Sequence, residues 1–564
     1  MWHPTTAVRT VFPVVGVCLL VFFWGLGQIP FYTRGEPREA VVVWEIANNG
    51  EWILPLRDGT EIPSKPPLFH WLGALVSTAL GRVDEFTVRF PSALLGLCGV
   101  LLTYETGKRF WGAEAGRTAA LVLATNFEWW RTAVAARVDM TLTFFLVAAF
   151  LWFLTLYHDR TGARGKALLF ALLLGLATLA KGPVGVLLPS LTVGGFLWLR
   201  GELRFIKQLR PLASTALFLV VAGSWYALAL WQGGGRFFWK QIVEENFIHF
   251  VDPELAATGH QHPFYYFVPN LVLGLAPWSV FLPALALFLY QRRHAWAAEG
   301  LLYPLVWFAT VFVFFSAAAG KRSVYILPLY PAVALLFGAW WSRVQNGEYP
   351  ALWLVRLGAY GSGALFLVAA GVLGAQLLGG DLARTLRPVL APTDQGQMAF
   401  FARCVTEHAP AVWLWLGGVG LGLGALLWAL RRERWEWVVG ALTGLTAGSL
   451  FLVQSLFLPA LARERTVKPF VARVRRAVSD SAPLYFYRVF DHGALFYARR
   501  HIPEVDRLED IVTPCFLLMD EREWQRVREQ DKTGLNLLDT SEGTGPEGNS
   551  RLVLVAAVPP PRKP

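Results

Sequence analysis

The chain has 564 residues, of which 55% are hydrophobic and only 16% are charged. Many of its apolar residues stand in uncharged blocks of ~17–25 residues, long enough to cross a hydrocarbon layer ~30 Å thick. This pattern excludes a soluble enzyme, a disordered protein and a disulfide scaffold. It also excludes an outer-membrane barrel, whose strands alternate in polarity and are about 10 residues long. The net charge is +11, and most of the excess lies in short loops, which indicates membrane topology and not nucleic-acid binding.

The apolar blocks predict a mainly α, polytopic helical membrane protein with about thirteen transmembrane helices. The first block is preceded by one arginine and lacks a cleavage site with small residues, so it is typical of a retained helix and not of a cleaved signal. Two of the blocks, 115–128 and 167–180, are short for a bilayer. The predicted spans are 11–28, 88–107, 115–128, 140–157, 167–180, 184–199, 211–231, 267–290, 300–318, 323–342, 351–378, 411–430 and 437–458.

The loops between these spans alternate in charge and length. One set is short and rich in Lys and Arg, which is typical of the cytoplasmic side of a bacterial inner membrane protein. The opposite set is longer and is predicted to be extracytoplasmic, which would put the functional face on the periplasmic side. Its members are 29–87, 129–139, 232–266, 379–410 and the tail from about residue 460.

The tail differs in composition from the rest of the chain, because its charge rises and its apolar runs shorten from Leu461 onward. We therefore predict a transmembrane domain over 1–460 and a small extracytoplasmic α/β domain over 461–564. The expected strands and helices follow from periodicity and residue type. The strands are 483–489, 515–520 and 551–558, and the helices are 490–500 and 521–530.

The first outer loop, 29–87, carries two amphipathic segments, 37–49 and 66–80, which are predicted to lie as helices in the membrane interface. Charged side chains in this loop would then be held at the level where the phosphate of a lipid carrier lies. Arginine can bind phosphate bidentately, and lysine acts on it as a point charge. The alternative is that these are solvated loop charges, as in most charge runs. The side chains are Arg34, Glu36, Arg38, Glu45 and Lys65.

Three further outer-face segments place ionisable side chains at the start or end of predicted spans. Such groups are costly at a membrane and are functional candidates, although long side chains can also reach the interface from helix ends. Because the positive-inside rule disfavours cations on this face, we interpret the clusters together as a site for an anionic lipid. They are Arg131, Arg137 and Asp139; Lys181 at a Gly-Pro break; and Lys321 and Arg322 beside Tyr325.

Several segments, in order, resemble the integral-membrane glycosyltransferases of the protein O-mannosyltransferase / 4-amino-4-deoxy-L-arabinose (lipid A) transferase superfamily. The resemblance covers about residues 25–335 and implies a GT-C fold and a polyprenyl-phosphate sugar donor. The segments are Arg34-Gly35-Glu36-Pro37-Arg38 with Gly50-Glu51-Trp52, Ser64-Lys65-Pro66-Pro67-Leu68, Arg89-Phe90-Pro91-Ser92, Arg137-Val138-Asp139, Lys181-Gly182-Pro183, and Gly320-Lys321 with Tyr325-Ile326-Leu327-Pro328.

The resemblance also implies roles for single residues. Glu36 and Asp139 match acidic positions of the first and second outer loops and are the candidate catalytic residues. One of His260 and His262 falls where relatives place a histidine near the site, and Arg34 and Arg137 are further candidates. The candidate ligands of the carrier phosphate are Arg38, Lys65, Lys181, Lys321, Arg322 and Tyr325.

Two departures from the family pattern affect these roles. Relatives carry an Asp-Glu pair in the first loop, whereas here Gly35 precedes Glu36. Some relatives carry a glutamate before the Lys-Pro motif that, with a histidine, resembles a zinc ligand pair, whereas this chain has Ser64. One histidine and a serine make a poor zinc site. We therefore predict no structural metal and no cofactor, with a divalent metal as the alternative.

The predicted function is transfer of a sugar from a polyprenyl-phosphate donor, such as undecaprenyl phosphate, to an extracytoplasmic acceptor, with inversion at the anomeric carbon. Lipid A or lipopolysaccharide, a protein hydroxyl and another glycan remain open as acceptors, and the sequence does not name the sugar. No nucleotide-binding Gly-rich loop is visible, which suits a lipid-linked donor. The alternatives are a transporter or lipid flippase, which would predict repeated halves and charges deep within helices, and a membrane scaffold with a soluble tail.

Overall fold

The computed structural model describes residues 4–159, 161–248, 262–386, 388, 392–512, 514–529, 534–546 and 550–557. Its contacts divide the chain into two compact units. The first, here called the membrane unit, comprises Met1–Trp24, Ser64–Phe69 and Ser92–Phe457. The second, here called the loop–tail unit, comprises Gly25–Pro63, His70–Pro91 and Leu458–Pro564.

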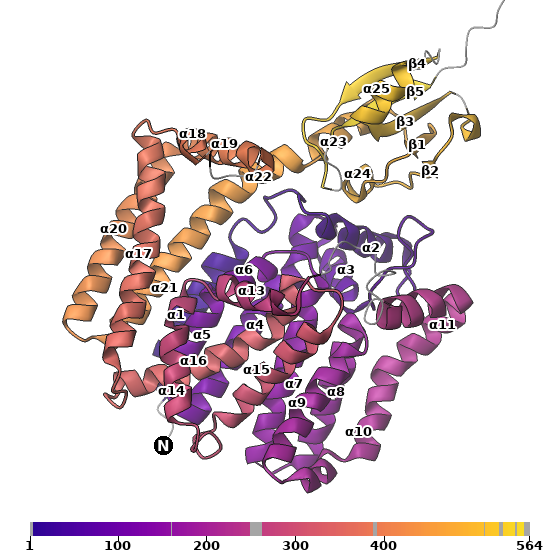
Figure 1. The fold of residues 1–564 in the computed structure, drawn as a ribbon. Helices are drawn as coiled ribbons and strands as arrows, with labels where there is room; N and C mark the ends of the chain where they lie inside the picture. Colours follow the sequence, from indigo (N-terminus) through magenta and orange to yellow (C-terminus); the bar gives the residue numbers. More distant parts are fainter. Residues whose placement is uncertain are drawn as a thin grey trace, which may run out of the picture. The chain divides into compact units, whose positions relative to one another are not determined.

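The membrane unit is built of helices, and each predicted apolar span is helical over most of its length (Figure 1). Its elements are α1 (Pro4–Cys18), η1 (Leu19–Phe23), α4 (Glu85–Trp111), α5 (Ala113–Thr125), α6 (Phe127–Ala133), α7 (Val138–His158), α8 (Ala163–Lys181), α9 (Val184–Leu199), η2 (Leu203–Leu209), α10 (Pro211–Phe218), η3 (Leu219–Gly223), α11 (Ser224–Phe237), η4 (Phe238–Ile248), η5 (Phe264–Tyr266), α13 (Phe267–Gly274), η6 (Trp278–Phe281), α14 (Leu282–Gln291), α15 (Leu302–Ala317), η7 (Ser323–Leu329), α16 (Tyr330–Gln345), α17 (Leu352–Leu377), α18 (Leu382–Leu386), α19 (Pro392–Glu407), α20 (Ala409–Arg431), α21 (Trp435–Leu452) and η8 (Val453–Phe457).

Length and composition allow eight helices among the described residues to cross a membrane, or nine if the bent pair Phe264–Gly274 and Trp278–Gln291 forms one span. That pair is bent by 108° at a break that contains Pro277, as expected where a proline interrupts helical hydrogen bonding. Other apolar helices, such as Val184–Leu199 and Leu302–Ala317, are shorter than this test requires. The polytopic helical fold is confirmed, whereas the number thirteen is not.

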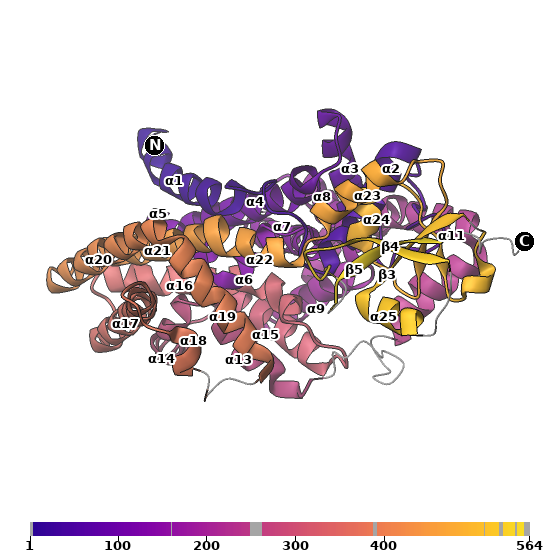
Figure 2. The same cartoon turned by 90° about the horizontal axis from the view of Figure 1, so that it is seen from above.

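Small residues allow the helices of the membrane unit to approach closely, as is common in membrane proteins. A Cβ atom on Gly185 of α9 would lie 2.3 Å from the carbonyl carbon of Ala177 on α8. A Cβ atom on Gly338 of α16 would lie 2.3 Å from the carbonyl oxygen of Ala115 on α5. These contacts fix α8 against α9 and α5 against α16. Helices α17, α20 and α21 run beside one another (Figure 2).

Several of the predicted cytoplasmic loops lie at one end of the helices. The end of α7 contacts both the end of α4 and the turn after α9, and the end of α4 contacts the segment before α15. Because α7 and α8 form an antiparallel pair, the start of α7 and the end of α8 lie at the opposite end. The linking contacts are the rings of Phe110 and His158 at 4.8 Å, Tyr157 Oη to Glu202 at 2.9 Å, and Trp111 Nε1 to the carbonyl oxygen of Glu299 at 2.8 Å.

The loop–tail unit contains a five-stranded mixed sheet in the order β2-β1-β3-β5-β4. Strand β1 pairs in parallel with β2 and β3, while β5 pairs antiparallel with β3 and β4. The predicted strands and helices of the tail are confirmed, and β2, β4 and α23 were not predicted. The elements are α2 (Gly35–Asn49), α3 (Leu68–Leu80), α22 (Leu458–Arg465), α23 (Lys468–Ala477), β1 (Leu484–Tyr487), α24 (His492–Ala498), β2 (Glu504–Val505), η9 (Leu508–Asp510), β3 (Cys515–Asp520), α25 (Glu521–Glu529), β4 (Leu535–Thr540) and β5 (Leu552–Ala557).

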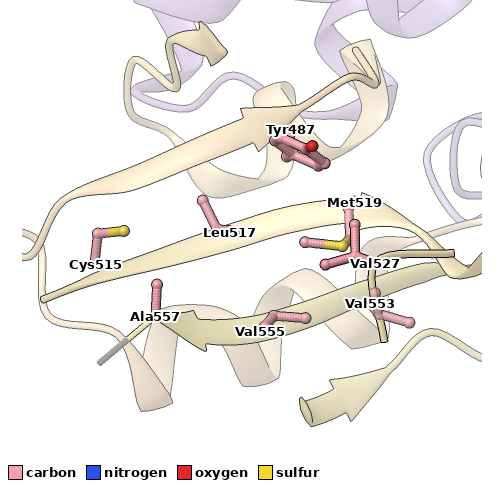
Figure 3. Packing of buried hydrophobic residues seen from close by; sticks show 8 residues of the cluster. All are labelled: Tyr487, Cys515, Leu517, Met519, Val527, Val553, Val555 and Ala557. Atoms are coloured by element: carbon pink, nitrogen blue, oxygen red, sulfur yellow. The ribbon is translucent and has the colours of Figure 1, made fainter. Parts of the chain in front are cut away.

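One face of this sheet carries a hydrophobic core (Figure 3). Alternate residues of β3 and of β5 point to this face, as the two-residue period of a strand requires. Val527 of α25 packs against them, so the helix covers the face. Cys515 belongs to this core as a free thiol. The cluster consists of Tyr487, Cys515, Leu517, Met519, Val527, Val553, Val555 and Ala557.

Within the loop–tail unit, the tail contacts the first outer loop through polar groups. The Tyr497 hydroxyl donates to Glu85 at 2.9 Å and accepts from the backbone N–H of Phe31 at 3.0 Å. Lys468 pairs with the same Glu85 carboxylate at 2.7 Å. The contacts therefore group residues of the first outer loop with the tail, and the predicted division into 1–460 and 461–564 stays a prediction.

Candidate active site

The centre of the candidate site is an ion pair between Asp139 and Lys181. Asp139 is the second residue of α7 and Lys181 is the last residue of α8, so the antiparallel packing of these helices brings them together. The two side chains are only 12% and 16% exposed, respectively. Gly182 follows with φ 81° and ψ −156°, a conformation that favours glycine. The Lys181-Gly182-Pro183 motif thus ends α8 directly after the lysine and starts α9.

Three more side chains complete a group that we call the Asp139 cluster: Arg137, Asp139, Lys181, Arg322 and Tyr325. The Lys181 ammonium lies 4.5 Å from the centre of the Tyr325 ring, within the range of a cation–π interaction. The positive charges of Arg137 and Arg322 both act on the Asp139 carboxylate. Arg137 precedes α7 and Arg322 precedes η7, each with extended backbone angles.

A hydrogen bond between neighbouring elements positions the start of η7. Arg131 of α6 donates from Nη2 to the hydroxyl of Ser323 at 3.0 Å and also pairs with Glu128 of its own helix. Ser323 is the first residue of η7 and follows Arg322 directly. The bond therefore fixes the segment that carries Arg322 and Tyr325.

The Asp139 cluster carries more positive than negative charge. Lys181 pairs with Asp139, and the charges of Arg137 and Arg322 act on the same carboxylate. The N-terminus of α7 adds a partial positive charge at Asp139, because helix dipoles place about half an elementary charge there. The cluster can therefore accept a further anion, such as a phosphate group.

Lys321 and Lys65, the other predicted lysine ligands in the membrane unit, have different partners. Lys321 is buried and donates to the carbonyl oxygen of Ala318 at 2.7 Å, so its ammonium lies on the turn before η7. Lys65 pairs with Glu245 of η4 at 2.5 Å, and the two side chains are 25% and 11% exposed. The structure thus brings together Asp139, Arg137, Lys181, Arg322 and Tyr325, and it gives Lys65 a separate carboxylate.

The predicted acid Glu36 forms a buried ion pair with Arg89 in the loop–tail unit. The Arg89 Nε and Nη2 atoms donate to the two carboxylate oxygens at 2.7 and 3.1 Å, and both side chains are at most 3% exposed. Arg89 Nη1 also donates to the carbonyl oxygens of Leu26 at 3.0 Å and Ile29 at 2.6 Å. The pair therefore ties α2 to the start of the first outer loop.

A second group in the loop–tail unit joins Arg38, a predicted ligand of the carrier phosphate, to the buried residues Glu39 and His70, which were not predicted. His70 lies 2.7 Å from one oxygen of Glu39, and Arg38 donates to the other at 3.0 Å. Burial raises the pKa of Glu39, but the charges of Arg38 and His70 outweigh it and hold that pKa well below its usual range. The signal in the sequence was the histidine after the Lys65-Pro66-Pro67 motif, at the start of an amphipathic helix.

The remaining predicted residues are Arg34, His262 and His260. Arg34 is exposed at the start of α2. His262 stacks on Tyr266 with ring centres 4.1 Å apart, and His260 lies outside the described residues. Across the described parts of the chain, no group of three or more His, Cys, Asp and Glu side chains has the arrangement to hold a metal ion. The prediction of no structural metal stays a prediction.

Comparison with known proteins gives matches to membrane glycosyltransferases. Residues 64–226 match the family model of dolichyl-phosphate-mannose-protein mannosyltransferases. An undecaprenyl phosphate-alpha-4-amino-4-deoxy-L-arabinose arabinosyl transferase of Edwardsiella ictaluri is 27% identical over 70% of this chain and 71% of its own length. An uncharacterised protein of Aquifex aeolicus is 30% identical over 60% of this chain and 66% of its own length. The chain thus spans about two thirds of the length of these relatives.

The fold matches a solved structure over nearly the whole chain. The crystal structure of ArnT from Cupriavidus metallidurans bound to undecaprenyl phosphate superimposes with a TM-score of 0.79 at 21% identity, covering 98% of this chain and 99% of that one. This likeness establishes a polytopic membrane protein of the GT-C type. Within that class, the family match over residues 64–226 and the arabinosyl transferase relatives support a glycosyltransferase of the superfamily that contains ArnT and the protein O-mannosyltransferases.

Proposed function

We propose that this chain transfers a sugar from a polyprenyl-phosphate donor to an acceptor on the outer face of the inner membrane, and that the Asp139 cluster is the reaction centre. The observation that carries the proposal is the placement of three cations around one partly accessible carboxylate at the ends of α7 and α8. A structural ion pair needs one cation, whereas a site that receives an anionic phosphate needs a surplus. The undecaprenyl phosphate donor in the name of the Edwardsiella ictaluri relative supports the same class of donor.

The reaction is a displacement at the anomeric carbon. The bond from that carbon to the phosphate oxygen breaks, and its electron pair remains on the phosphate, where Lys181, Arg137 and Arg322 stabilise the growing negative charge. A lone pair of the acceptor oxygen forms the new bond from the opposite side, which inverts the anomeric centre. Asp139 accepts the proton when the acceptor is a hydroxyl. A phosphate acceptor, as in lipid A, is already ionised and needs no base.

Two features bear on the acceptor and on the alternative functions. The arabinosyl transferases among the relatives and the match to the protein mannosyltransferase family keep both lipid A or lipopolysaccharide and a protein hydroxyl as acceptors. The functional groups lie at helix ends and not deep within spans, which disfavours a transporter or flippase.

The donor site is tested by removing single cations. Lys181→Ala and Lys65→Ala are expected to raise the Michaelis constant for undecaprenyl-phosphate-linked sugar by roughly 10–100-fold, because a charge-assisted hydrogen bond contributes ~1.5–3 kcal/mol. Lys207→Ala, which removes an exposed lysine from η2, is the matched control and should leave this constant unchanged. Thermal unfolding of each variant separates lost binding from lost folding. Michaelis constants equal to that of the wild type in both folded variants would exclude the phosphate role.

The outer-face location is a separate part of the proposal. It is supported by the contacts among the basic loops at the end of the helices opposite to Asp139 and Lys181. In a variant without Cys404 and Cys515, Ser481→Cys in the exposed turn before β1 should react with a membrane-impermeant maleimide in intact spheroplasts. Thr161→Cys, in the exposed turn between α7 and α8, should react only after permeabilisation. The reverse pattern would place the site in the cytoplasm.

A further inference from the structure

Glu245, which the proposed mechanism does not use, sits between two lysines of the membrane unit. Its Oε2 atom lies 2.5 Å from the Lys65 ammonium, and its Oε1 atom lies 3.9 Å from the Lys240 ammonium. Lys240 also binds the neighbouring carboxylate, Glu244, at 2.6 Å. Glu245 is thus engaged mainly by Lys65, with a second cation within reach, whereas Glu244 has Lys240 as its ion-pair partner.

We propose that Glu245 is a resident counter-ion of the donor site: it neutralises Lys65 when no carrier is bound, and the carrier phosphate displaces it. The inference rests on the proposed function, because it takes Lys65 as a ligand of the carrier phosphate. Two anions that contact the same ammonium repel one another, so the carboxylate and the phosphate compete for it. Binding of the carrier phosphate therefore weakens the pairing of Glu245 with Lys65.

The arrangement lowers the cost of this exchange. A carboxylate that is 11% exposed would be costly to leave without a cation. Lys240, five residues earlier on the same π-helical segment, η4 (Phe238–Ile248), already lies 3.9 Å away. When the phosphate takes Lys65, Glu245 can turn toward Lys240 without unfolding η4. In this exchange, Lys240 replaces Lys65 as the ion-pair partner of Glu245.

The competition should act more strongly on the product than on the donor. The lipid-linked sugar is a phosphodiester with one negative charge, whereas the released polyprenyl phosphate is a monoester with a charge of about −1.5 to −2 at pH 7. The more highly charged product would be held more tightly by Lys65. Glu245 therefore assists release of the product by pairing with Lys65 again. It acts on turnover through Lys65 and does not touch the reacting atoms, so it is a positioning residue.

The test compares Glu245→Gln with Glu244→Gln, its neighbour on the same segment. The measurements are the inhibition constant of undecaprenyl phosphate and the Michaelis constant of the lipid-linked sugar, both on the full-length protein in the same nanodiscs. For Glu245→Gln, we expect the inhibition constant to fall roughly three- to tenfold and the Michaelis constant to fall less. Glu244→Gln should match the wild type in both constants. A residue that only held Lys65 in place would instead raise both constants when replaced.

The outcomes separate this inference from the proposed function. If the wild type binds undecaprenyl phosphate and Lys65→Ala weakens that binding, the proposed donor site with Lys65 as a ligand is supported. If Glu245→Gln then shows an unchanged or higher inhibition constant, the counter-ion role is overturned alone. If the wild type does not bind undecaprenyl phosphate, both are overturned.

Discussion

Asp139→Asn is expected to lower the rate of sugar transfer by ~10²–10⁴-fold, the usual cost of losing a catalytic carboxylate. Asparagine keeps the shape of the side chain and an oxygen that can accept from Lys181, so the packing of α7 against α8 should persist. The carboxylate charge is lost. With it go the ability to take a proton from a hydroxyl acceptor and, for an ionised phosphate acceptor, the stabilisation of the positive character that develops on the sugar. We expect the turnover number to fall with little change in the Michaelis constant for the donor.

The same helix supplies a matched control. Asp159, which follows the last residue of α7, pairs with Lys166 at 2.7 Å at the opposite end of the α7–α8 pair. Asp159→Asn breaks a similar Asp–Lys pair without touching the cluster and should retain near-normal turnover. Equal activity of the two variants would remove Asp139 from the mechanism.

Glu36→Gln is expected to act first on stability. Removing one partner of a buried ion pair costs ~3–5 kcal/mol, because the other charge stays buried without its partner. Arg89 would lose its carboxylate in a position where its side chain is 3% exposed, so the melting temperature should fall clearly. Measured on the folded fraction, Glu36→Gln should retain more activity than Asp139→Asn.

A more exposed ion pair of the same unit provides the comparison for this effect. Arg473 and Asp539 are 38% and 30% exposed, and pairs of this kind contribute ~0–1 kcal/mol. Arg473→Ala should therefore change the melting temperature far less than Glu36→Gln does. If Glu36→Gln melts like the wild type but is inactive, while Asp139→Asn is active, Glu36 is the catalytic acid.

The sequence was sufficient to predict the helices and strands that depend on local residue patterns. Apolar run length predicts the helices of the membrane unit, and two-residue periodicity predicts β1, β3 and β5 of the tail. Strand β4 escaped prediction because its residues, Leu535–Thr540, form the partly exposed edge of the sheet and lack a regular alternation. The number of thirteen spans is not confirmed, because several predicted blocks, such as 184–199 and 300–318, form apolar helices that are shorter than a typical span.

The sequence did not predict the features that depend on packing between distant segments. The motifs named Glu36, Arg89, Lys65, Asp139 and Lys181, but not which of them pair. Glu36 meets Arg89 across 53 residues and Lys65 meets Glu245 across 180. These pairings follow from how helices cross, which no single-segment pattern encodes. For the same reason, the contact of the first outer loop with the tail was not foreseen.

The central claim is tested most directly by following the carrier itself. Purified protein in nanodiscs is incubated with undecaprenyl-phosphate-linked sugar and an acceptor lipid, and both lipids are analysed by mass spectrometry. We predict release of undecaprenyl phosphate together with a matching amount of glycosylated acceptor, and formation of both products ~10²–10⁴-fold more slowly with Asp139→Asn. Movement of the intact sugar lipid across the bilayer, with no free undecaprenyl phosphate and no glycosylated acceptor, would contradict the account.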